Sequence, residues 1–251
     1  MLLKAVELKK SIKGAIEEKL FFTNSHGKEA RIEMYEYKDA KITWLGHDGF
    51  KIVSGSETLV IDPFKLSHNV FSDFVLISHE HFDHCNPDDL KKVLKPSTII
   101  IAISSCKEEL SKASAKEIKI VNPGDRVDIG SFQVHAVPAY NTNKYSAQGK
   151  HFHPKEDGKV GYIVTTKGGV SIYHTGDSDV IPEMENLKPD IVLVPVSGTY
   201  VMTSDEAVDA VSKIKPKIAI PMHYGTIVGS EQDAEKFKKN AKCEVQILAR
   251  E

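Results

Sequence analysis

The sequence predicts an α/β protein, because closely spaced strands open its main region and strands alternate with helices toward its end. Three apolar segments, 42–44, 50–53 and 58–61, are separated only by short turns, so we expect them to pair as antiparallel hairpins. Near the other end, a strand at 191–194 is followed by a helix at 203–214 and by another strand. This alternation is typical of α/β folds.

The length and composition are those of a soluble globular protein. With 251 residues, 41% of them hydrophobic and 27% charged, the chain is long enough for one substantial core. Its net charge of −2 offers no basic excess for a nucleic-acid partner, and no apolar run is long enough to span a membrane. Only three cysteines and an N-terminus unlike a signal peptide indicate a cytoplasmic location.

Residues 1–40 are expected to form an extension outside the main domain, which covers residues 41–251. Apolar residues between Leu3 and Ile16 approximate a helical stripe, and the turn at 24–27 precedes a short strand. One interpretation is an extra helix and strand packed on the edge of the domain. The alternative is a contact in a homo-oligomer.

The central part of the chain continues with buried strands and short helices. The segment 74–77 is wholly apolar, as expected of a strand covered on both faces. Asn86 can cap a helix that begins at Pro87. Another buried strand is expected at 98–103, and a helix at 106–113.

The second half carries more strands and one long loop. The stretch 140–159 lacks periodicity, and a loop of this length in a compact domain is usually functional or disordered. Thr203 and Glu206 form a capping-box pair at the start of the helix that ends at 214. Strands are expected at 118–121, 132–137, 161–166, 170–173, 218–220 and 245–248, and a last helix at 231–240.

Four potential metal ligands, His79, His81, Asp83 and His84, fall within six residues directly after the strand 74–77. His79 and His81 can turn toward one ion, and Asp83 and His84 can reach a second ion beside it. Imidazole and carboxylate ligands suit zinc, and also manganese, iron or nickel. The alternative is a surface loop that happens to be rich in histidine.

The run His79-x-His81-x-Asp83-His84 after an apolar strand resembles the signature of the metallo-β-lactamase superfamily. The segment 44–47, Trp-Leu-Gly-His, is similar to the opening of the subgroup that includes ascorbate-phosphate lactonase and related uncharacterised metal-dependent hydrolases. The resemblance covers about residues 41–251. It implies a four-layer αββα sandwich that holds two divalent metal ions.

The resemblance assigns roles to residues that follow strands in the expected order. It implies that Asp177 bridges the two ions and that His223 binds the second ion. It also implies that Asp62 supports the metal loop rather than binding metal, and that His47 lies near the site, although a turn histidine without a chemical role is an equal alternative. Tyr140 follows a strand end, where substrate-contacting loops gather.

The chain departs from the superfamily at one position. Where a further histidine ligand of the first ion is expected, after the strand 132–137, it has Asn141. Either Asn141 itself coordinates or places a water ligand, or a histidine of the following loop, His151 or His153, fills the position. A third alternative is a site of reduced occupancy, and His135, in the middle of a strand, is a poorer candidate.

The expected activity is hydrolysis of a small ester, lactone or phosphoester by a metal-bound hydroxide. Asp83 would be both ligand and catalytic residue, because it can orient the attacking water and accept its proton. One alternative is an RNA-processing nuclease of the same fold, although no RNA-gripping insertion is evident. The other is a non-catalytic member that binds a metal or ligand. The substrate is expected to be a small molecule.

Overall fold

The computed structural model describes residues 4–6, 21–23, 31, 33–185 and 187–251. It divides into two compact units, Met1–Ile32 and Glu33–Glu251. In the first unit, β1 (Lys4–Val6) pairs antiparallel with β2 (Phe21–Thr23). A helix was expected around residues 3–16, but residues Lys4–Val6 form a strand. The rest of that prediction lies outside the described residues.

The second unit begins before residue 41, because β3 (Met34–Tyr37) pairs antiparallel with β4 (Ala40–Gly46). β3 is the edge strand of a sheet, and its residues alternate between exposed and half-buried. Edge strands bury less apolar surface than central ones, so this segment carries little of the hydrophobic pattern by which strands are detected in a sequence.

Seven strands form the first sheet of this unit, in the same order as in the sequence. The first three pairings are antiparallel and the last three are parallel. The antiparallel pairings of β4 with β5 and of β5 with β6 are the hairpins that the sequence predicted. After β3 and β4 come β5 (Gly49–Ser54), β6 (Glu57–Ile61), β7 (Phe74–Ile77), β8 (Ile99–Ala102) and β9 (Glu117–Ile120).

The second sheet repeats this plan, with three antiparallel pairings followed by three parallel ones. The two sheets thus share one topology, although the sequence shows no repeat that can be aligned by eye. The strands of the second sheet are β10 (Arg126–Ile129), β11 (Phe132–Pro138), β12 (Val160–Thr166), β13 (Ser171–His174), β14 (Ile191–Pro195), β15 (Ile218–Met222) and β16 (Glu244–Val245).

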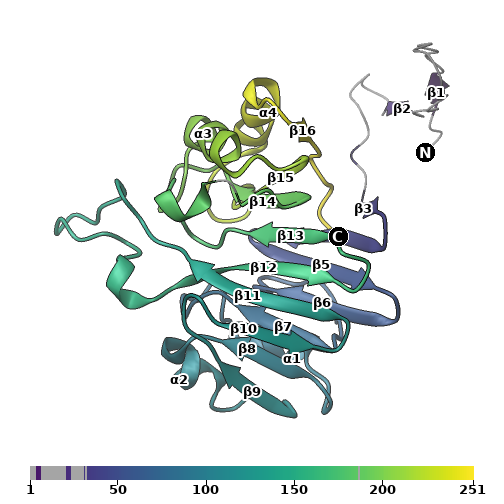
Figure 1. Ribbon diagram of the computed structural model, residues 1–251, viewed down its shortest axis with the longest axis vertical. Coiled ribbons are helices and arrows are strands. Elements are labelled where there is room, and N and C mark those ends of the chain that lie inside the picture. Colours follow the sequence, from purple (N-terminus) through teal and green to yellow (C-terminus); the bar gives the residue numbers. More distant parts are fainter. Residues whose placement is uncertain (1–3, 7–20, 24–30, 32, 186) are drawn as a thin grey trace. The chain divides into compact units, whose positions relative to one another are not determined.

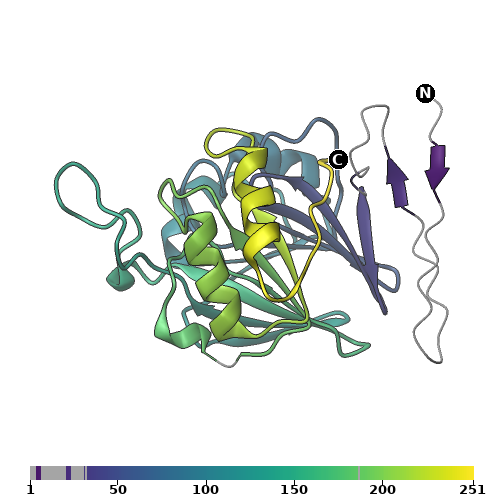
Figure 2. The same cartoon turned by 90° about the horizontal axis from the view of Figure 1, so that it is seen from above.

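The helices lie on the outer faces of the two sheets, which gives the αββα sandwich that the family resemblance implied. Figure 2 shows α3 (Ser204–Ile214) and α4 (Glu231–Asn240) side by side, and they pack on β14 and β15. The helices α1 (Pro87–Val93) and α2 (Lys107–Leu110) lie beside β8 and β9 on the other side (Figure 1). Three short 3₁₀ turns complete the unit: η1 (Ser104–Cys106), η2 (Lys155–Asp157) and η3 (Pro182–Met184).

Capping residues place the helix starts where the sequence predicted them. Asn86 accepts hydrogen bonds from two backbone N–H groups of α1, and Thr203 forms a complete capping box with Glu206 at α3. The helix expected at 106–113 is shorter, because Cys106 belongs to η1 and α2 ends at Leu110. Among the described residues, no helix combines the length and apolar character needed to cross a membrane.

The most buried strands are closely followed by residues with polar side chains. Every residue of β7, β14 and β15 is buried. Their backbone groups are satisfied by the sheet, and the first side chains free to carry chemistry follow the strand ends. The hydroxyl of Tyr162 in β12 donates a 2.7 Å hydrogen bond to the carbonyl of Ile77, which joins the two sheets directly behind the histidine-rich run.

Candidate metal centre

The histidine-rich run forms a tight turn immediately after β7. The backbone N–H groups of His84 and Cys85 both donate to the carbonyl of His81, at 2.9 Å each. This geometry folds the run back on itself, so His79 and His84 approach to 4.0 Å between ring centroids. The turn therefore presents its imidazoles to one region, as the spacing predicted.

A first cluster consists of His79, His81 and His153, whose ring nitrogens lie within 4.8 Å of one another. His153 comes from the long loop between β11 and β12, and its Nε2 atom is 3.3 Å from Nδ1 of His81. His79 and His153 are buried, whereas the side chain of His81 is 40% exposed. Three imidazoles facing one point form a ligand set that suits zinc.

Asn141 lies behind His153 rather than in this cluster. Its side-chain oxygen accepts hydrogen bonds from the backbone N–H of His153, at 2.9 Å, and from Nδ1, at 3.0 Å. Its amide nitrogen donates to the carbonyl of Tyr200 at 2.9 Å. Both polar atoms of Asn141 are thus engaged, and the position expected for a metal-ligating histidine instead orients a histidine from later in the loop.

Asp177, which follows β13, lies at the middle of the site. One carboxylate oxygen, Oδ2, is 3.3 Å from Nε2 of His153, 3.5 Å from Nε2 of His223 and 4.0 Å from Nε2 of His79. The other oxygen, Oδ1, is 3.4 Å from Nε2 of His84. The carboxylate therefore faces histidines of both clusters, which is the position that a bridging ligand requires.

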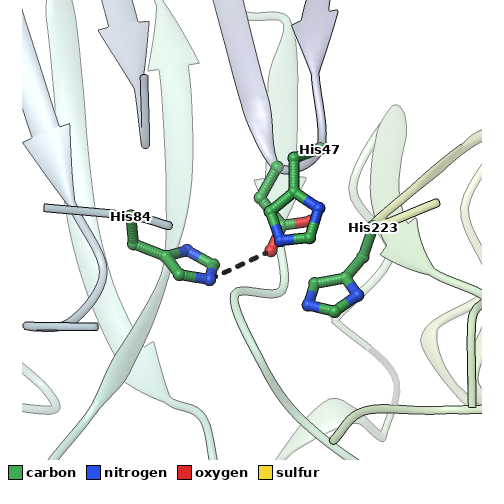
Figure 3. A group of neighbouring side chains, drawn as sticks. His47, His84 and His223 are labelled. Carbon is green, nitrogen blue, oxygen red and sulfur yellow. Dashed lines mark ion pairs between the residues drawn. The ribbon is translucent and has the colours of Figure 1, made fainter. Parts of the chain in front are cut away.

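A second cluster consists of His47, Asp48, His84 and His223, all of them buried. His47 and Asp48 occupy the turn between β4 and β5, and His223 follows β15. Figure 3 shows the three imidazoles converging from separate elements. Nδ1 of His223 lies 2.9 Å from the hydroxyl of Ser197, which fixes the ring and leaves Nε2 directed inward.

Asp83 contacts this second cluster through a histidine. Its Oδ2 atom lies 3.0 Å from Nε2 of His47 and 3.8 Å from Nε2 of His84. Burial alone would raise the pKa of Asp83, but the hydrogen bond from His47 and the charge of His84 lower it to about 2. The carboxylate is therefore ionised at neutral pH and can accept a hydrogen bond.

Asp62 supports the metal run from behind. It accepts hydrogen bonds from the backbone N–H of Ser78 at 2.8 Å and from the Ser78 hydroxyl at 2.5 Å. Its Oδ2 atom lies 3.0 Å from Nδ1 of His84, and the Ser78 hydroxyl lies 2.9 Å from Nδ1 of His79. A carboxylate that engages one imidazole nitrogen fixes the tautomer and leaves the other nitrogen available as a ligand.

The backbone is strained at three residues of the site. His47, Asp62 and His223 have φ angles of 51°, 42° and 58°, in the left-handed region that non-glycine residues rarely adopt. Such conformations persist only where the surrounding structure imposes them, and they gather at functional sites. Each of the three follows a strand end, so the strain aims its side chain into the site.

Several buried atoms of the site have no hydrogen-bond partner. They are Nδ1 of His47, Nε2 of His79, His84 and His223, Oδ1 of Asp177, and both carboxylate oxygens of Asp48. Buried polar atoms without partners are costly, and few are found in native proteins. Because these atoms belong to the two clusters or to Asp177 between them and have the chemistry of metal ligands, the residues fit a pair of divalent cations.

The electrostatics of the site favour neutral imidazoles at some positions and positive charge at others. Burial lowers the pKa of His153 to about 4 and that of His79 well below the ordinary value, so both rings are neutral and able to bind metal at pH 7. Burial also opposes charge on His84, but Asp177 and Asp62 raise its pKa well above the ordinary value. The carboxylates thus create a strong preference for a cation beside His84.

Tyr140, expected from the sequence to contact substrate, belongs to neither cluster. Its hydroxyl donates to Glu183 at 2.9 Å, and the ammonium group of Lys155 lies over its ring. Conversely, the sequence interpretation did not single out Asp48, which the structure places in the second cluster. The available signal was an aspartate between two glycines at a hairpin turn, which is too common a pattern to indicate a metal site.

Comparison with known proteins agrees with this geometry. Residues 41–223 match the family model of the beta-lactamase superfamily domain. The chain is 34% identical to a UPF0173 metal-dependent hydrolase of Archaeoglobus fulgidus, over 81% of this chain and 91% of that protein. It is 32% identical to a UPF0173 metal-dependent hydrolase of Thermoplasma acidophilum, over 80% and 90%. A crystal structure of a candidate metal-dependent hydrolase from Parabacteroides distasonis superimposes with a TM-score of 0.70 at 28% identity, covering 98% of both chains.

The αββα sandwich and the histidine and aspartate clusters define a metal-dependent hydrolase of the metallo-β-lactamase superfamily. Within that superfamily, the chain belongs to the family of UPF0173 metal-dependent hydrolases. This assignment favours an enzyme over the non-catalytic binding module considered from the sequence.

Proposed function

We propose that the protein is a binuclear hydrolase that cleaves a small ester, lactone or phosphoester. The observation that carries the proposal is the convergence of buried ligand atoms without hydrogen-bond partners on both sides of Asp177. In this proposal the first cluster, His79, His81 and His153, holds one divalent ion. Asp83, His84 and His223 would hold the second, and Asp177 would be shared between the two.

Two divalent ions at this place would lower the pKa of a water molecule and polarise the oxygen of a carbonyl or phosphoryl group. The protein's own contribution is orientation and proton transfer. Asp83, ionised and held by His47 at 3.0 Å, is positioned to orient the attacking water and to accept its proton. The pKa of His47 is lowered by burial to about 4, so it donates to Asp83 as a neutral ring.

Exposed aromatic side chains lie next to residues of the site in the chain or contact their neighbours. Phe82, inside the metal run, is 64% exposed, and Tyr200 is 41% exposed. Tyr200 contacts Phe152 edge to face, with ring centroids 4.7 Å apart, and Phe152 directly precedes His153. These rings offer apolar contacts to a small organic substrate, whereas nucleic-acid binding would call for a positively charged surface.

The experiment combines metal analysis with a substrate panel. The purified protein is stripped with chelator, reloaded with zinc or manganese, and assayed against aryl esters, small lactones, an aryl phosphodiester and single-stranded RNA. We expect two ions per chain and turnover of at least one small substrate that chelation abolishes. Asp177→Asn should abolish both the binding of two ions and the turnover. Asp190→Asn, at a buried carboxylate outside the clusters, should affect neither metal binding nor turnover. Turnover of RNA alone would replace this proposal with the nuclease alternative.

A further inference from the structure

The hairpin between β4 and β5 has an unusual turn. Its two central residues, His47 and Asp48, are both completely buried, although the tips of hairpins are ordinarily exposed to solvent. A register shift between Trp44 and Gly46 precedes the turn, and Gly46 has a φ of 101°. Such an irregularity re-aims the side chains that follow it, and here it directs the turn into the second cluster.

The side chain of Asp48 makes no hydrogen bond to the described residues. Neither carboxylate oxygen accepts a hydrogen bond, although the side chain is 0% exposed. Its backbone is held separately, because Nε2 of His174 lies 2.9 Å from its carbonyl oxygen. An ionised carboxylate without partners in the interior is strongly destabilising unless a cation neutralises it.

The histidines present do not offset the negative charge around Asp48. Oδ2 of Asp48 is 3.6 Å from Nε2 of His84, but the same nitrogen also faces Oδ1 of Asp177 at 3.4 Å and Oδ2 of Asp83 at 3.8 Å. Asp83 and Asp177 have other histidine partners, whereas Asp48 pairs only with this shared imidazole among the described residues. The remaining charge calls for a further cation at the point on which these oxygens converge.

We propose that Asp48 is a direct ligand of the second metal ion, and that it shifts this site's preference toward a cation that favours oxygen ligands, such as Mn²⁺. The inference rests on the proposed binuclear centre. Carboxylate ligands suit manganese and magnesium, while imidazole-rich sets suit zinc, copper and nickel. The first cluster consists of imidazoles alone, whereas the second adds the carboxylate of Asp48 to its imidazoles. The two sites therefore differ in the metal they favour.

The test uses Asp48→Asn, which keeps the shape of the side chain and removes its charge, with Asp190→Asn as the control. The two carboxylates of Asp190 and Asp48 are both buried, but Asp190 already accepts hydrogen bonds from Ser171 and Lys217. Chelated proteins are titrated separately with Mn²⁺ and Zn²⁺, and bound metal is counted by mass spectrometry and by the electron paramagnetic resonance of Mn²⁺.

We expect Asp48→Asn to retain the first ion and to weaken the second by more than about tenfold, with Mn²⁺ affinity falling more than Zn²⁺ affinity. In chelated protein the variant should unfold at the same temperature as the wild type or a higher one, because the Asp48 side chain accepts no hydrogen bond that the substitution would break. The control, Asp190→Asn, should bind both ions as the wild type does. It should be less stable than the wild type both with and without metal. Asp48→Ser provides a second variant if the first does not fold.

Three outcomes would overturn the inference. If the wild type binds two ions and Asp48→Asn binds them with unchanged affinities, Asp48 is not a ligand, while the proposed function stands. If the second ion weakens but its Mn²⁺ to Zn²⁺ affinity ratio is unchanged, the claim of selectivity fails. If the wild type itself binds no second ion under any loading, the binuclear centre and this inference both fail.

Discussion

The ring of His153 is held by Asn141, whose side-chain oxygen lies 3.0 Å from Nδ1 and also accepts a 2.9 Å hydrogen bond from the His153 backbone N–H. With Nδ1 engaged, Nε2 is left to face Asp177 at 3.3 Å. Asn141 thus stands at the sequence position where a ligand was expected, and it holds the ring of the ligand candidate His153. This pairing explains how the chain tolerates an amide where its superfamily resemblance implies a histidine.

Substitution of these two residues should therefore have different effects on metal binding. We expect His153→Ala to lower the metal content by about one ion per chain, because the first cluster would keep only two imidazoles. Asn141→Ala should keep the stoichiometry and weaken binding about 10- to 100-fold, as expected when the support of a ligand is lost. The measurement is metal content after dialysis against graded chelator. His135→Ala, in β11, is the control, and an unaltered metal content in His153→Ala would contradict the assignment.

The sequence predicted most of this site because its spacing is short and local. Three of the clustered side chains, together with Asp83, come from one run of six residues, so their proximity follows from a single turn. Asp177 and His223 were assigned through the family resemblance, and the structure places both beside His84 or His153. The role of His153 depends on the path of a long loop, which leaves no periodic signal. For the same reason the choice between Asn141 and a loop histidine could not be made from the sequence.

Asp83 should be essential for turnover but not for folding. Asp83→Ala removes the group that we propose to orient and deprotonate water, so kcat should fall by about 10²- to 10⁴-fold. The far-ultraviolet circular dichroism spectrum should be unchanged, because Asp83 contacts His47 and His84 rather than the core. Asp88→Ala, at an exposed aspartate on α1, is the matched control. Retention of wild-type kcat by Asp83→Ala on a substrate that the wild type turns over would refute the mechanism.

Asp62 is expected to act on metal affinity through the residues that it holds. Asp62→Asn cannot accept from both Ser78 and His84 as the carboxylate does, because one of its two side-chain atoms becomes a donor. The His84 ring would lose its preferred tautomer, and metal affinity should fall about 10- to 100-fold. Competition with a fluorescent zinc chelator measures the change. Equal affinities for the variant and the wild type would show that Asp62 has no influence on the ligands.

The hydrogen bond between the two sheets provides a test of stability. The Tyr162 hydroxyl donates to the carbonyl of Ile77 at 2.7 Å in a fully buried setting. Tyr162→Phe leaves that carbonyl without this donor, so the free energy of unfolding should fall by about 1 to 3 kcal/mol. Urea unfolding of chelated protein measures the difference without a contribution from metal. Tyr145→Phe, at a tyrosine that is 54% exposed, should have little effect and serves as the control.

The fold was predictable where burial and capping leave strong local signals. The wholly apolar 74–77 became β7, and the capping pair of Thr203 and Glu206 fixed the start of α3. The weakly patterned strands β3 and β10 were missed, because most of their residues are exposed or only half-buried. Both strands pair with the next strand through a tight hairpin, Tyr37 opposite Ala40 and Ile129 opposite Phe132, so the weak apolar alternation and not distance along the chain hid them.

The loop that carries His153 is anchored by a charge pair that should respond to acid. Lys144 in this loop donates to both carboxylate oxygens of Glu206 on α3, at 2.8 and 2.9 Å. Burial would raise the pKa of Glu206, but the hydrogen bond from Lys144 and that from the Thr203 backbone lower it to about 2. Because the pKa in the folded protein lies below the ordinary value of 4.5, the ionised form favours folding.

The stabilisation from this pair is therefore complete above about pH 4.5 and is lost as the pH falls toward 2. We expect the difference in melting temperature between the wild type and Glu206→Gln to be constant from pH 7 to 5 and to shrink at lower pH. Chelated protein is used for both, so that titration of the metal ligands affects them equally. Lys91→Gln, which breaks an exposed pair with Asp88 on α1, is the control and should leave the wild-type profile nearly unchanged. A difference that grows as the pH falls would show that the protonated form of Glu206 stabilises the loop, the reverse of what the contact with Lys144 requires.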